Sequence, residues 1–334
     1  MKTIPKGSVG IKDVARAAGV SPATVSRALG GGPISDALRE QVEAAVRATG
    51  YRPNLAARRL RSQHSGTIGL IVADIRNPFF TAVGRAVEAA AYQAGLRVIL
   101  CNADEDPERE AMYLRLMQEE RITGLILAPT RQTWESLVRR TLDFPVVLID
   151  RAGNGGVHDA VVLNNAEASA ELVDHLAERG YRRIAGMFGN TSSTGLQRAE
   201  GYAEAMRRHG LTPQPRLIAP TAEAAAGAVA AWLDETPRPD ALIASNSLLL
   251  MGALKTLRAH GLRVPNDVAL AGFDNENWTE LVEPGITVIE QPVEEIGQTA
   301  MNLLFERLKN PALPVRKLVL AGRCIVRGST AANA

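Results

Sequence analysis

The segment SPATVSRALGG, residues 21–31, has outward-facing chemistry that a short structural helix does not need. Ser21 is a favoured N-cap and Pro22 suits the first helical position, so we expect a helix to begin here. Helical spacing turns three side chains inward, Val25, Ala28 and Leu29, and leaves four facing out, Pro22, Ala23, Ser26 and Arg27. A hydroxyl and a guanidinium among small residues favour a face that contacts another molecule.

The charge of the first 62 residues indicates what kind of molecule that face contacts. Residues 1–62 contain 11 Lys and Arg against 4 Asp and Glu, whereas the other 272 residues contain 27 against 32. The formal net charge of the whole chain is only +2, so the positive charge is concentrated in the first segment. A basic segment attached to an acidic body favours a polyanion as its partner.

Catalytic and cofactor-binding motifs are missing from the sequence, so we do not expect an enzyme. No strand-like run is followed by the glycine pattern of a dinucleotide site or a P-loop, and there is no G-x-S-x-G motif. The five histidines are scattered, and no Cys/His spacing predicts zinc. Cys101 and Cys324 lie in apolar runs, where free buried thiols in a reducing compartment are expected. We expect no cofactor and no metal.

Residues 10–50 predict three helices, the first two of which form a helix-turn-helix. The first helix, in IKDVARAAGV, is followed by Gly19, which suits a left-handed turn. The third is expected to begin at Ser35 and to end at Gly50. The expected inward residues are Ile11, Val14, Ala15 and Ala18 in the first helix and Leu38, Val42, Ala45 and Val46 in the third.

From Thr67 onwards, apolar runs of strand length alternate with helical stretches, as in TIGLIVAD, LRVILCN and DALIAS. Continuous apolar strands between helices predict parallel sheets covered on both faces. About ten such strands are too many for one typical open sheet, and the segment DRAGNGGVH, residues 150–158, is rich in glycine. We therefore expect two α/β subdomains, with ligands bound beyond the carboxyl ends of the strands.

The ordered motifs of the chain resemble those of the lactose-repressor family of bacterial transcription regulators. IKDVARAAGVSPATVSRAL is similar to the DNA-binding signature of that family, and GYRPNLAARRL is similar to its hinge. IGLIVADIRNPFF, VVLIDR, QRAEGY, DVALAGFDN and TVIEQP resemble successive strand-end motifs of its effector domain, which is also similar to periplasmic sugar-binding proteins. The resemblance spans residues 11–327 and implies an all-α helix-turn-helix headpiece followed by two doubly wound parallel-sheet α/β subdomains.

The resemblance implies that residues 21–29 form a recognition helix in the major groove of double-stranded operator DNA. Base-reading positions fall on Pro22, Ala23 and Arg27, and Arg27 could form a bidentate pair with guanine worth ~1–3 kcal/mol. Pro22 and Ala23 permit only apolar contacts, so the operator half-site cannot be carried over from relatives. Ser21, Thr24 and Ser26 are implied phosphate contacts, although capping and ordinary helix-surface roles also explain them.

The segment after Pro53 resembles the hinge helix, expected at about residues 54–61. In the family, two hinge helices pair in the minor groove and a leucine from each enters a central base step, a role that falls on Leu60 with Ala57 beside it. Asn54 begins this segment, and Arg58 with its neighbouring arginines would contact phosphates. A solvated linker is the alternative interpretation of the same residues.

The resemblance also maps an effector cleft onto strand ends of both subdomains. Nine positions match sugar-binding positions of ribose-type binding proteins, and they are Asn77, Phe79, Phe80, Asp150, Arg151, Arg198, Asn246, Asp274 and Gln291. Thr130, Ser192, Thr194 and Trp278 complete the expected cleft. Carboxylates and arginines can bind adjacent hydroxyls in pairs, and an aromatic face can cover a sugar ring. Capping roles for the aspartates and a core role for Phe79 are the alternatives.

Three departures leave the effector open. Ala222 stands where sugar binders carry an aromatic residue, Ser247 replaces a common aspartate, and Trp278 could restore the stacking wall. Arg151 and Arg198 could equally hold a carboxylate, so both a sugar and a sugar acid fit. A purine is a weaker alternative, because Ser192 and Thr194 lack the arginine expected beside them.

The expected domain organisation is a DNA-binding domain at residues 1–62 and an effector-binding and dimerisation domain at residues 66–330. Its N-subdomain is expected at about 66–160 plus 292–318, and its C-subdomain at about 161–291 plus 319–330. The resemblance implies a homodimer that binds a palindromic operator under allosteric control. Rival interpretations are a sugar-binding module without a regulatory role, a sugar-processing enzyme and an architectural DNA binder.

The expected location is the cytoplasm, without a membrane partner. MKTIPKGSVG lacks the apolar core of a signal peptide, and no window approaches 18 apolar residues.

Overall fold

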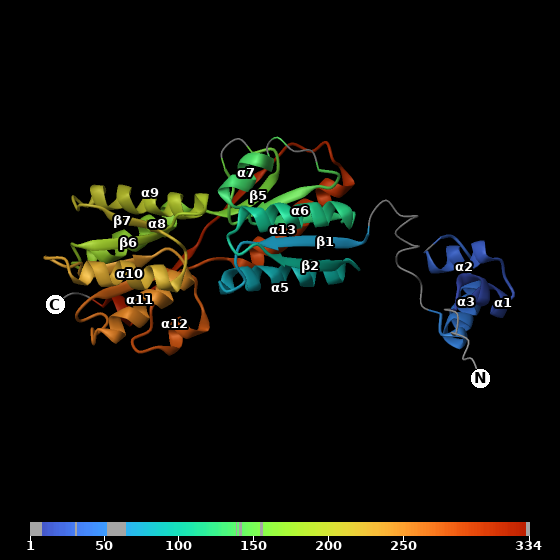
Figure 1. Ribbon diagram of the computed structural model, residues 1–334, viewed down its shortest axis with the longest axis horizontal. Coiled ribbons are helices and arrows are strands. Elements are labelled where there is room, and N and C mark those ends of the chain that lie inside the picture. The colour runs from blue at the N-terminus through green and yellow to red at the C-terminus, as the bar shows by residue number, and fades with distance from the viewer. Residues whose placement is uncertain are drawn as a thin grey trace. The chain divides into compact units, whose positions relative to one another are not determined.

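The protein, analysed as a computed structural model, divides into two compact units at residues 1–64 and 65–334 (Figure 1). The structure describes residues 9–30, 32–51, 65–137, 139, 142–153 and 156–331.

The first unit contains the three expected helices, α1 (Ile11–Ala17), α2 (Pro22–Leu29) and α3 (Asp36–Thr49). Val14, Val25 and Val42, one from each helix, are fully buried in the shared core. Ile11, Leu38 and Val46 are only half-buried, not buried as expected, and of these Ile11 and Val46 pack at the margin of the core.

Polar contacts from α3 hold the helix-turn-helix in place. The Gln41 side-chain amide donates to the Ala18 carbonyl at 2.9 Å, and the Arg39 guanidinium donates to the Ala28 carbonyl at 3.1 Å. These carbonyls lie at the ends of α1 and α2, where no backbone N–H of the same helix is available. Gly19 makes the turn between the two helices with a φ of +63°, a left-handed conformation that favours glycine.

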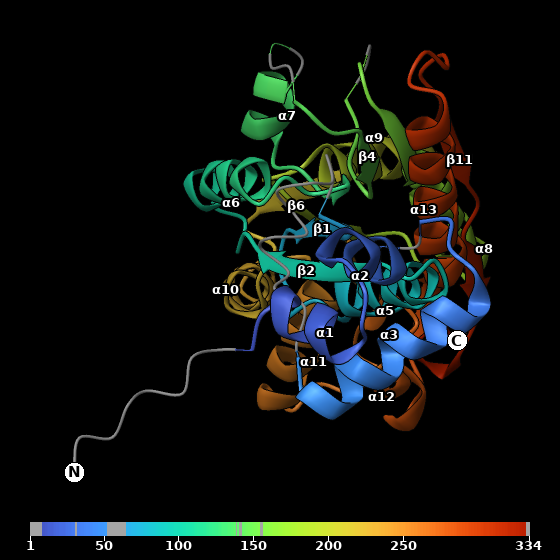
Figure 2. The same ribbon diagram turned by 90° about the vertical axis from the view of Figure 1, so that its right-hand side faces the viewer.

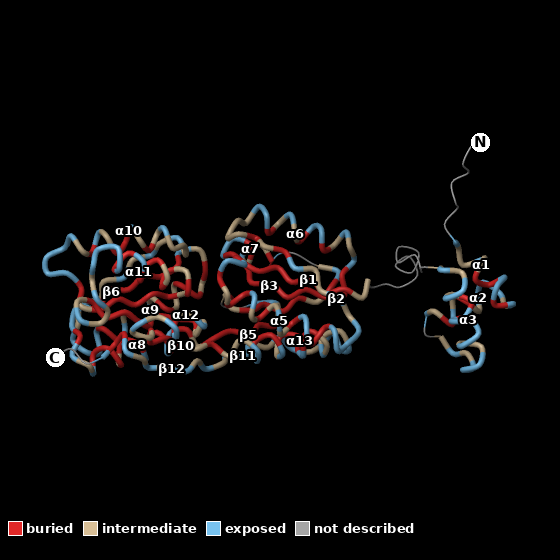
Figure 3. The backbone as a smooth tube through the Cα atoms, turned by 90° about the horizontal axis from the view of Figure 1, so that it is seen from below, coloured by how far each residue is buried: buried red, intermediate tan, exposed pale blue. Residues whose placement is uncertain are grey.

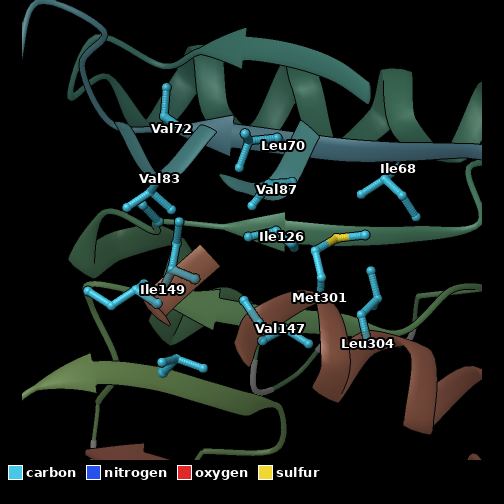
Figure 4. Packing of buried hydrophobic residues seen from close by; sticks show 14 of the residues in the cluster. Ile68, Leu70, Val72, Val83, Val87, Ile126, Val147, Ile149, Met301 and Leu304 are labelled. Carbon is cyan, nitrogen blue, oxygen red and sulfur yellow. The ribbon is translucent and has the colours of Figure 1, made fainter. Parts of the chain in front are cut away.

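The second unit begins with a six-stranded sheet, sheet A, whose strands in the described residues run in the order β11-β5-β4-β3-β1-β2 and pair in parallel. One face packs against α5 and α13, and Figure 4 shows Val87 and Met301 of these helices beside strand residues such as Ile126. The other face packs against α6 and α7 (Figure 2). The strands are β1 (Thr67–Val72), β2 (Arg97–Asn102), β3 (Gly124–Leu127), β4 (Val146–Ile149), β5 (Asp159–Leu163) and β11 (Lys317–Leu320). The helices are α5 (Pro78–Gln93), α6 (Pro107–Glu119), α7 (Arg131–Leu137) and α13 (Val293–Lys309).

A second six-stranded sheet, sheet B, has the order β12-β10-β9-β8-β6-β7 within the described residues. Its strands pair in parallel except β12, which is antiparallel to β10. Helices α8 and α9 cover one face, and α10 and α11 cover the other, so that the inner strands β6, β8 and β9 are buried (Figure 3). The strands are β6 (Ile184–Gly189), β7 (Gln214–Ile218), β8 (Ala241–Ala244), β9 (Ala269–Phe273), β10 (Thr287–Glu290) and β12 (Arg323–Ile325). The helices are α8 (Asn165–Glu178), α9 (Ser193–Arg208), α10 (Ala222–Leu233), α11 (Ser247–Ala259), α12 (Asn277–Leu281) and the 3₁₀ helix η1 (Gly328–Thr330).

Twelve strands in the described residues exceed the expected ten, and the additional ones lie at sheet edges. β7 alternates between exposed and half-buried residues, and three of the four residues of β11 are exposed. These strands lack the continuous apolar run that marks a strand covered on both faces. The apolar pattern that predicts buried strands therefore does not predict β7 and β11.

The chain crosses between the two subdomains three times, after β5, after β10 and after β11. The boundaries expected at about residues 160 and 318 fall inside β5 and β11, within a few residues of two of these crossings. A side chain at Gly322 would meet Ile289 Cγ2 at 2.7 Å and the Glu290 carbonyl at 3.2 Å, with Leu163 Cδ1 at 3.5 Å. The three crossing segments therefore pack side by side, and Gly322 permits their close approach.

Candidate functional site

A cleft in the second unit lies where the carboxyl ends of strands from both sheets meet. Eleven of the thirteen expected effector residues line it, which are Asn77, Phe79, Phe80, Asp150, Arg151, Ser192, Thr194, Arg198, Asn246, Asp274 and Gln291. The first five follow β1 and β4 of sheet A, and the other six follow β6, β8, β9 and β10 of sheet B. Each subdomain thus contributes one half of the cleft.

Asp150 and Asp274 occupy equivalent positions in the two halves. Each directly follows a buried strand, β4 or β9, and each has a positive φ, +61° and +76°. The Asp150 N–H donates to the Val161 carbonyl at 3.1 Å, and the Asp274 N–H donates to the Ile289 carbonyl at 2.9 Å. Non-glycine residues held in this conformation concentrate at functional sites, and both residues line the cleft.

Three polar cleft residues also cap helices that begin at the cleft. Asn77 accepts from the Phe79 N–H at 3.1 Å, Ser192 accepts from the Gly195 N–H at 3.3 Å, and Asn246 accepts from the Leu249 N–H at 2.8 Å. These bonds begin α5, α9 and α11, whose positive dipole ends therefore lie beside the cleft. Helix capping, which the sequence suggested as an alternative role for Asp150 and Asp274, is thus performed by Asn77, Ser192 and Asn246.

Arg151 forms a buried ion-pair cluster with two carboxylates. Its Nη1 donates to Glu105 Oε2 at 2.9 Å, its Nη2 donates to Glu105 Oε1, and its Nε donates to Asp150 Oδ2 at 3.1 Å. The guanidinium also lies 5.9 Å from the centre of the Phe80 ring. All three nitrogens of Arg151 thus face carboxylate oxygens, the strongest geometry for an arginine.

Arg198 and Asp274 organise the sheet B half. Arg198 Nε donates to Asn165 Oδ1 at 2.8 Å, Nη1 donates to the Ser245 carbonyl, and the guanidinium stacks 3.9 Å from the Phe273 ring centre. Asp274 accepts from Gln291 Nε2 at 2.6 Å and from the Ser247 N–H at 2.9 Å. Within the described residues, Arg198 Nη2 is buried without a hydrogen-bond partner.

Burial and neighbouring charges shift the ionisation of these groups in opposite directions. Burial raises the pKa of Asp150 against the effect of Arg151, and burial raises the pKa of Asp274 against the effect of Arg198. Burial also acts to raise the pKa of Glu105, but Arg151 outweighs it, so the pKa of Glu105 lies below its ordinary value. Burial lowers the pKa of Arg198, which Asp274 and Asp150 partly offset. The cleft therefore contains carboxylates that gain by accepting new hydrogen bonds.

The side chains fill most of the cleft, and most of their polar atoms are paired with one another. Thr194 Oγ1 donates to the Asp150 carbonyl at 2.8 Å, which joins α9 to the end of β4 across the cleft. The remaining cavity is about 40 Å³. That volume accommodates roughly three water molecules, so a larger ligand must displace existing polar contacts.

Two expected cleft residues, Thr130 and Trp278, lie elsewhere. Thr130 Oγ1 donates to the buried Glu110 carboxylate at 2.6 Å, and its N–H donates to the same group. Trp278, in α12, packs beside the core between sheet B and α11 rather than forming a stacking wall. The indole points toward this apolar core, where removing its ring from water is favourable.

The structure adds cleft residues that the sequence did not single out, notably Asp74, Glu105 and Ser245. Each follows a strand of its sheet, β1, β2 or β8. Their position after a strand is the signal that could have identified them. In the sequence, however, Glu105 lies within the acidic stretch ADEDPERE, which resembles a solvated helix start.

Gly195 allows α9 to begin against the end of β6. A methyl group there would lie 1.9 Å from the Gly189 carbonyl oxygen, whereas one at Gly227 of α10 would meet open space. We expect Gly195→Ala to lower the free energy of unfolding by about 1–3 kcal/mol. Gly227→Ala should raise it by about 0.5–1 kcal/mol. Urea unfolding of both full-length variants measures the difference, and equal midpoints would contradict the close approach.

The outer face of α2 carries residues that are expected to contact DNA. Pro22, Ala23 and Arg27 are exposed, and the Thr24 hydroxyl lies 2.9 Å from Ser21 Oγ, the N-cap that accepts from the Thr24 N–H. Ser26 is half-buried on the same helix. The hinge residues Asn54, Ala57, Arg58 and Leu60 lie outside the described residues.

Metal binding and membrane insertion can both be judged from the described parts of the chain. No group of three or more His, Cys, Asp or Glu side chains there could hold a metal ion. None of the described helices has the length and apolar character needed to cross a membrane. Cys101 and Cys324 are free thiols, the first buried and the second half-buried.

Comparisons with known proteins agree with these features. A sequence profile described as bacterial regulatory proteins, lacI family, matches residues 10–54, and one described as periplasmic binding protein-like domain matches residues 173–330. The HTH-type transcriptional regulator PtxS of Pseudomonas plecoglossicida is 36% identical over 328 residues, which cover 96% of each chain. The ribose operon repressor of Escherichia coli strain K12 is 32% identical over 326 residues, covering 96% of this chain and 99% of that protein.

A solved structure matches both units of the chain. The lac repressor dimer bound to operator and the anti-inducer ONPF has a TM-score of 0.87 and 25% identity. The match covers 98% of this chain and 100% of that chain. The helix-turn-helix, the paired parallel sheets and the identity over nearly the whole length lead to one conclusion. This chain belongs to the lacI family of bacterial regulatory proteins, which are DNA-binding regulators of transcription.

Proposed function

We propose that the protein is a homodimeric repressor that binds a palindromic operator and is controlled by a small polyhydroxylated effector, a sugar or a sugar acid. The observation that carries the proposal is the cleft, where Asp150 with Arg151 and Asp274 with Arg198 come together from two subdomains. This cleft belongs to a chain whose first unit is a helix-turn-helix.

The DNA side of the proposal rests on α2. Its apolar residues, Val25 and Ala28, are buried, while Pro22, Ala23 and Arg27 remain exposed. Arg27 supplies the guanidinium for a guanine edge, and the serine and threonine hydroxyls supply phosphate contacts. In a homodimer, two such helices would read two half-sites related by a two-fold axis. Asn54, Ala57, Arg58 and Leu60 would contact the minor groove between them.

The effector side rests on the pairing chemistry of the cleft. Carboxylates accept hydrogen bonds from adjacent hydroxyls, and buried arginines donate to ring or hydroxyl oxygens. Phe79 and Phe80 meet edge to face, with ring centres 5.1 Å apart, and supply the apolar wall for C–H groups. This combination suits a compact polyol better than a planar base, which requires a broad stacking surface.

The coupling of the two sites rests on the three crossing segments. Closure of the cleft around an effector would turn the two subdomains about these segments and change the spacing of the dimer's DNA-binding units. The coupling free energy is reciprocal, so operator and effector must change each other's affinity by the same factor. A ligand that binds both arrangements equally would change nothing.

The test uses an operator selected in vitro by the full-length protein from random duplexes. Fluorescence anisotropy then measures the affinity for that duplex and for a scrambled one, with and without pentoses, hexoses, sugar acids, sugar phosphates and purines. We expect selective binding to a palindrome and a change in affinity with one polyol. If the protein selects no duplex, the interpretation as a sugar-binding module without a regulatory role is correct instead. If only a purine changes the affinity for DNA, the effector is a purine and not a sugar or sugar acid. If the protein binds DNA but no ligand changes that affinity, it is an architectural DNA binder.

A further inference from the structure

Arg151 is fully engaged by carboxylates of the protein itself. The side chains of Arg151 and Glu105 are 7% and 15% exposed, and their two-pronged contact uses both terminal nitrogens of the guanidinium. The third nitrogen donates to Asp150. A ligand carboxylate could use Arg151 only by competing with Glu105 for a bidentate pair, the arrangement that holds an arginine most firmly.

The backbone fixes Glu105 in this position. The Glu105 N–H donates to the Ala73 carbonyl at 2.8 Å, and Asp106 caps α6 by accepting from the Glu108 N–H at 2.8 Å. Glu105 itself has a φ of +57°, a left-handed conformation that glutamate rarely adopts. The strained turn between β2 and α6 therefore aims this carboxylate at Arg151.

Arg198 has a free hydrogen-bond donor for a ligand, whereas the nitrogens of Arg151 are already bonded to Glu105 and Asp150. Its Nη2 is buried without a partner among the described residues, and the residue as a whole has a relative exposure of only 3%. One unpartnered N–H group beside two buried aspartates suits a neutral hydroxyl or ring oxygen. A ligand carboxylate at this place would meet the negative charges of Asp150 and Asp274 as well.

The charges around the cleft also favour an uncharged ligand over one that carries a carboxylate. Four carboxylates, Asp74, Glu105, Asp150 and Asp274, line the cleft with only two guanidinium groups, Arg151 and Arg198. Arg76 pairs with Asp74 at 2.9 Å and with Asp104 at 2.7 Å, so it is also engaged. An uncharged polyol can donate to the excess carboxylates, whereas an anionic one adds a like charge.

We propose that Glu105 is a specificity-determining residue, which occupies Arg151 and thereby makes the cleft reject polyols that carry a carboxylate. The inference rests on the proposed effector function and narrows it from sugars and sugar acids to uncharged sugars. Glu105 acts through Arg151, so replacing its charge should open the cleft to acids without removing the contacts for hydroxyl groups.

The experiment compares each sugar with its own acid on the full-length protein. The probes are ribose and ribonate, glucose and gluconate, and galactose and galactonate, with calorimetric Kd values for wild type, Glu105→Gln, Glu105→Asp and Glu108→Gln. Glu108 is an exposed glutamate three residues away and serves as the matched control. We expect wild type to bind one neutral sugar and Glu105→Gln to gain about tenfold or more for the matching acid. Glu105→Asp keeps the charge and should exclude the acid, as should Glu108→Gln.

Three results would overturn the inference, and they differ from one another. If wild type binds an acid more tightly than the matching sugar, the inference that sugar acids are excluded is wrong, but the proposal that the cleft binds an effector still holds. Equal changes for sugar and acid in Glu105→Gln mean that Glu105 is structural. If no sugar or acid binds any variant, the proposed effector class is wrong and this inference falls with it.

Discussion

Replacing Asp274 with asparagine is expected to weaken effector binding strongly while making the unliganded protein more stable at neutral pH. Asp274 has a relative exposure of only 4%, and its carboxylate is the acceptor that we assign to a ligand hydroxyl. A hydrogen bond to a charged group contributes about 1.5–3 kcal/mol, so the affinity for the effector should fall by about ten- to hundredfold. The introduced side-chain amide keeps one acceptor oxygen, and the Gln291 amide can turn to restore its own contact.

The stability change follows from the ionisation of Asp274. Burial raises the pKa of this carboxyl above its ordinary value of 3.8, so the folded chain holds its proton to higher pH than the unfolded chain does. The stability from this group is therefore present at low pH and is lost as the pH rises through the folded-state pKa. Asparagine does not ionise, so the melting temperature of Asp274→Asn should exceed that of wild type at neutral pH. The difference should shrink as the pH falls below the raised pKa.

Asp267→Asn is the control with the opposite sign. Asp267 lies just before β9 and is half-buried, and it accepts from the Arg263 N–H at 2.8 Å and from Arg263 Nε at 3.0 Å. The Arg263 hydrogen bonds lower its pKa, so its stability is present at neutral pH and is lost as the pH falls. This variant should be no more stable than wild type and should bind effector normally. A less stable Asp274→Asn, or one with unchanged affinity, would contradict the assignment.

Arg27→Ala is expected to weaken binding to the selected operator by about ten- to hundredfold, because a bidentate contact to guanine contributes ~1–3 kcal/mol of discrimination. The side chain is exposed on α2, and the other two base-reading positions that the resemblance implies, Pro22 and Ala23, offer no polar group to a base. Affinity for a scrambled duplex should fall much less, since only one positive charge is removed. Anisotropy titrations of both duplexes at one fixed salt concentration measure the two changes.

Arg47→Ala is the matched charge control for Arg27→Ala. Arg47 is exposed in the last turn of α3, outside the outer face of α2. Its removal should weaken both duplexes alike and slightly, through the phosphate attraction that all base sequences share. If Arg27→Ala behaves in the same way, then Arg27 contributes only charge and the reading of bases lies elsewhere.

The sequence was sufficient for the arrangement of elements because local rules determine most of it. Ser21 caps α2 as expected, Gly19 and Gly50 have the left-handed φ values that helix ends favour, and apolar runs mark the covered strands. The same rules fail at the sheet edges, where β7 and β11 expose their side chains to solvent. The boundary expected at about residue 318 falls within β11, one of these edge strands.

Some features of the candidate cleft could be predicted from the sequence, whereas others depend on the tertiary structure. A position just after a buried parallel strand is readable in the sequence, and Asp150, Asp274 and Gln291 occupy such positions, but the resemblance to sugar-binding proteins is what singled them out. Which side chain then meets which partner depends on distances between strand ends. Glu105 lies 46 residues from Arg151 in the chain, yet their buried contact makes it Arg151's main partner. Thr130 bonds to Glu110 and Trp278 turns into the core for the same reason, since packing and charge pairing in three dimensions decide where a side chain points.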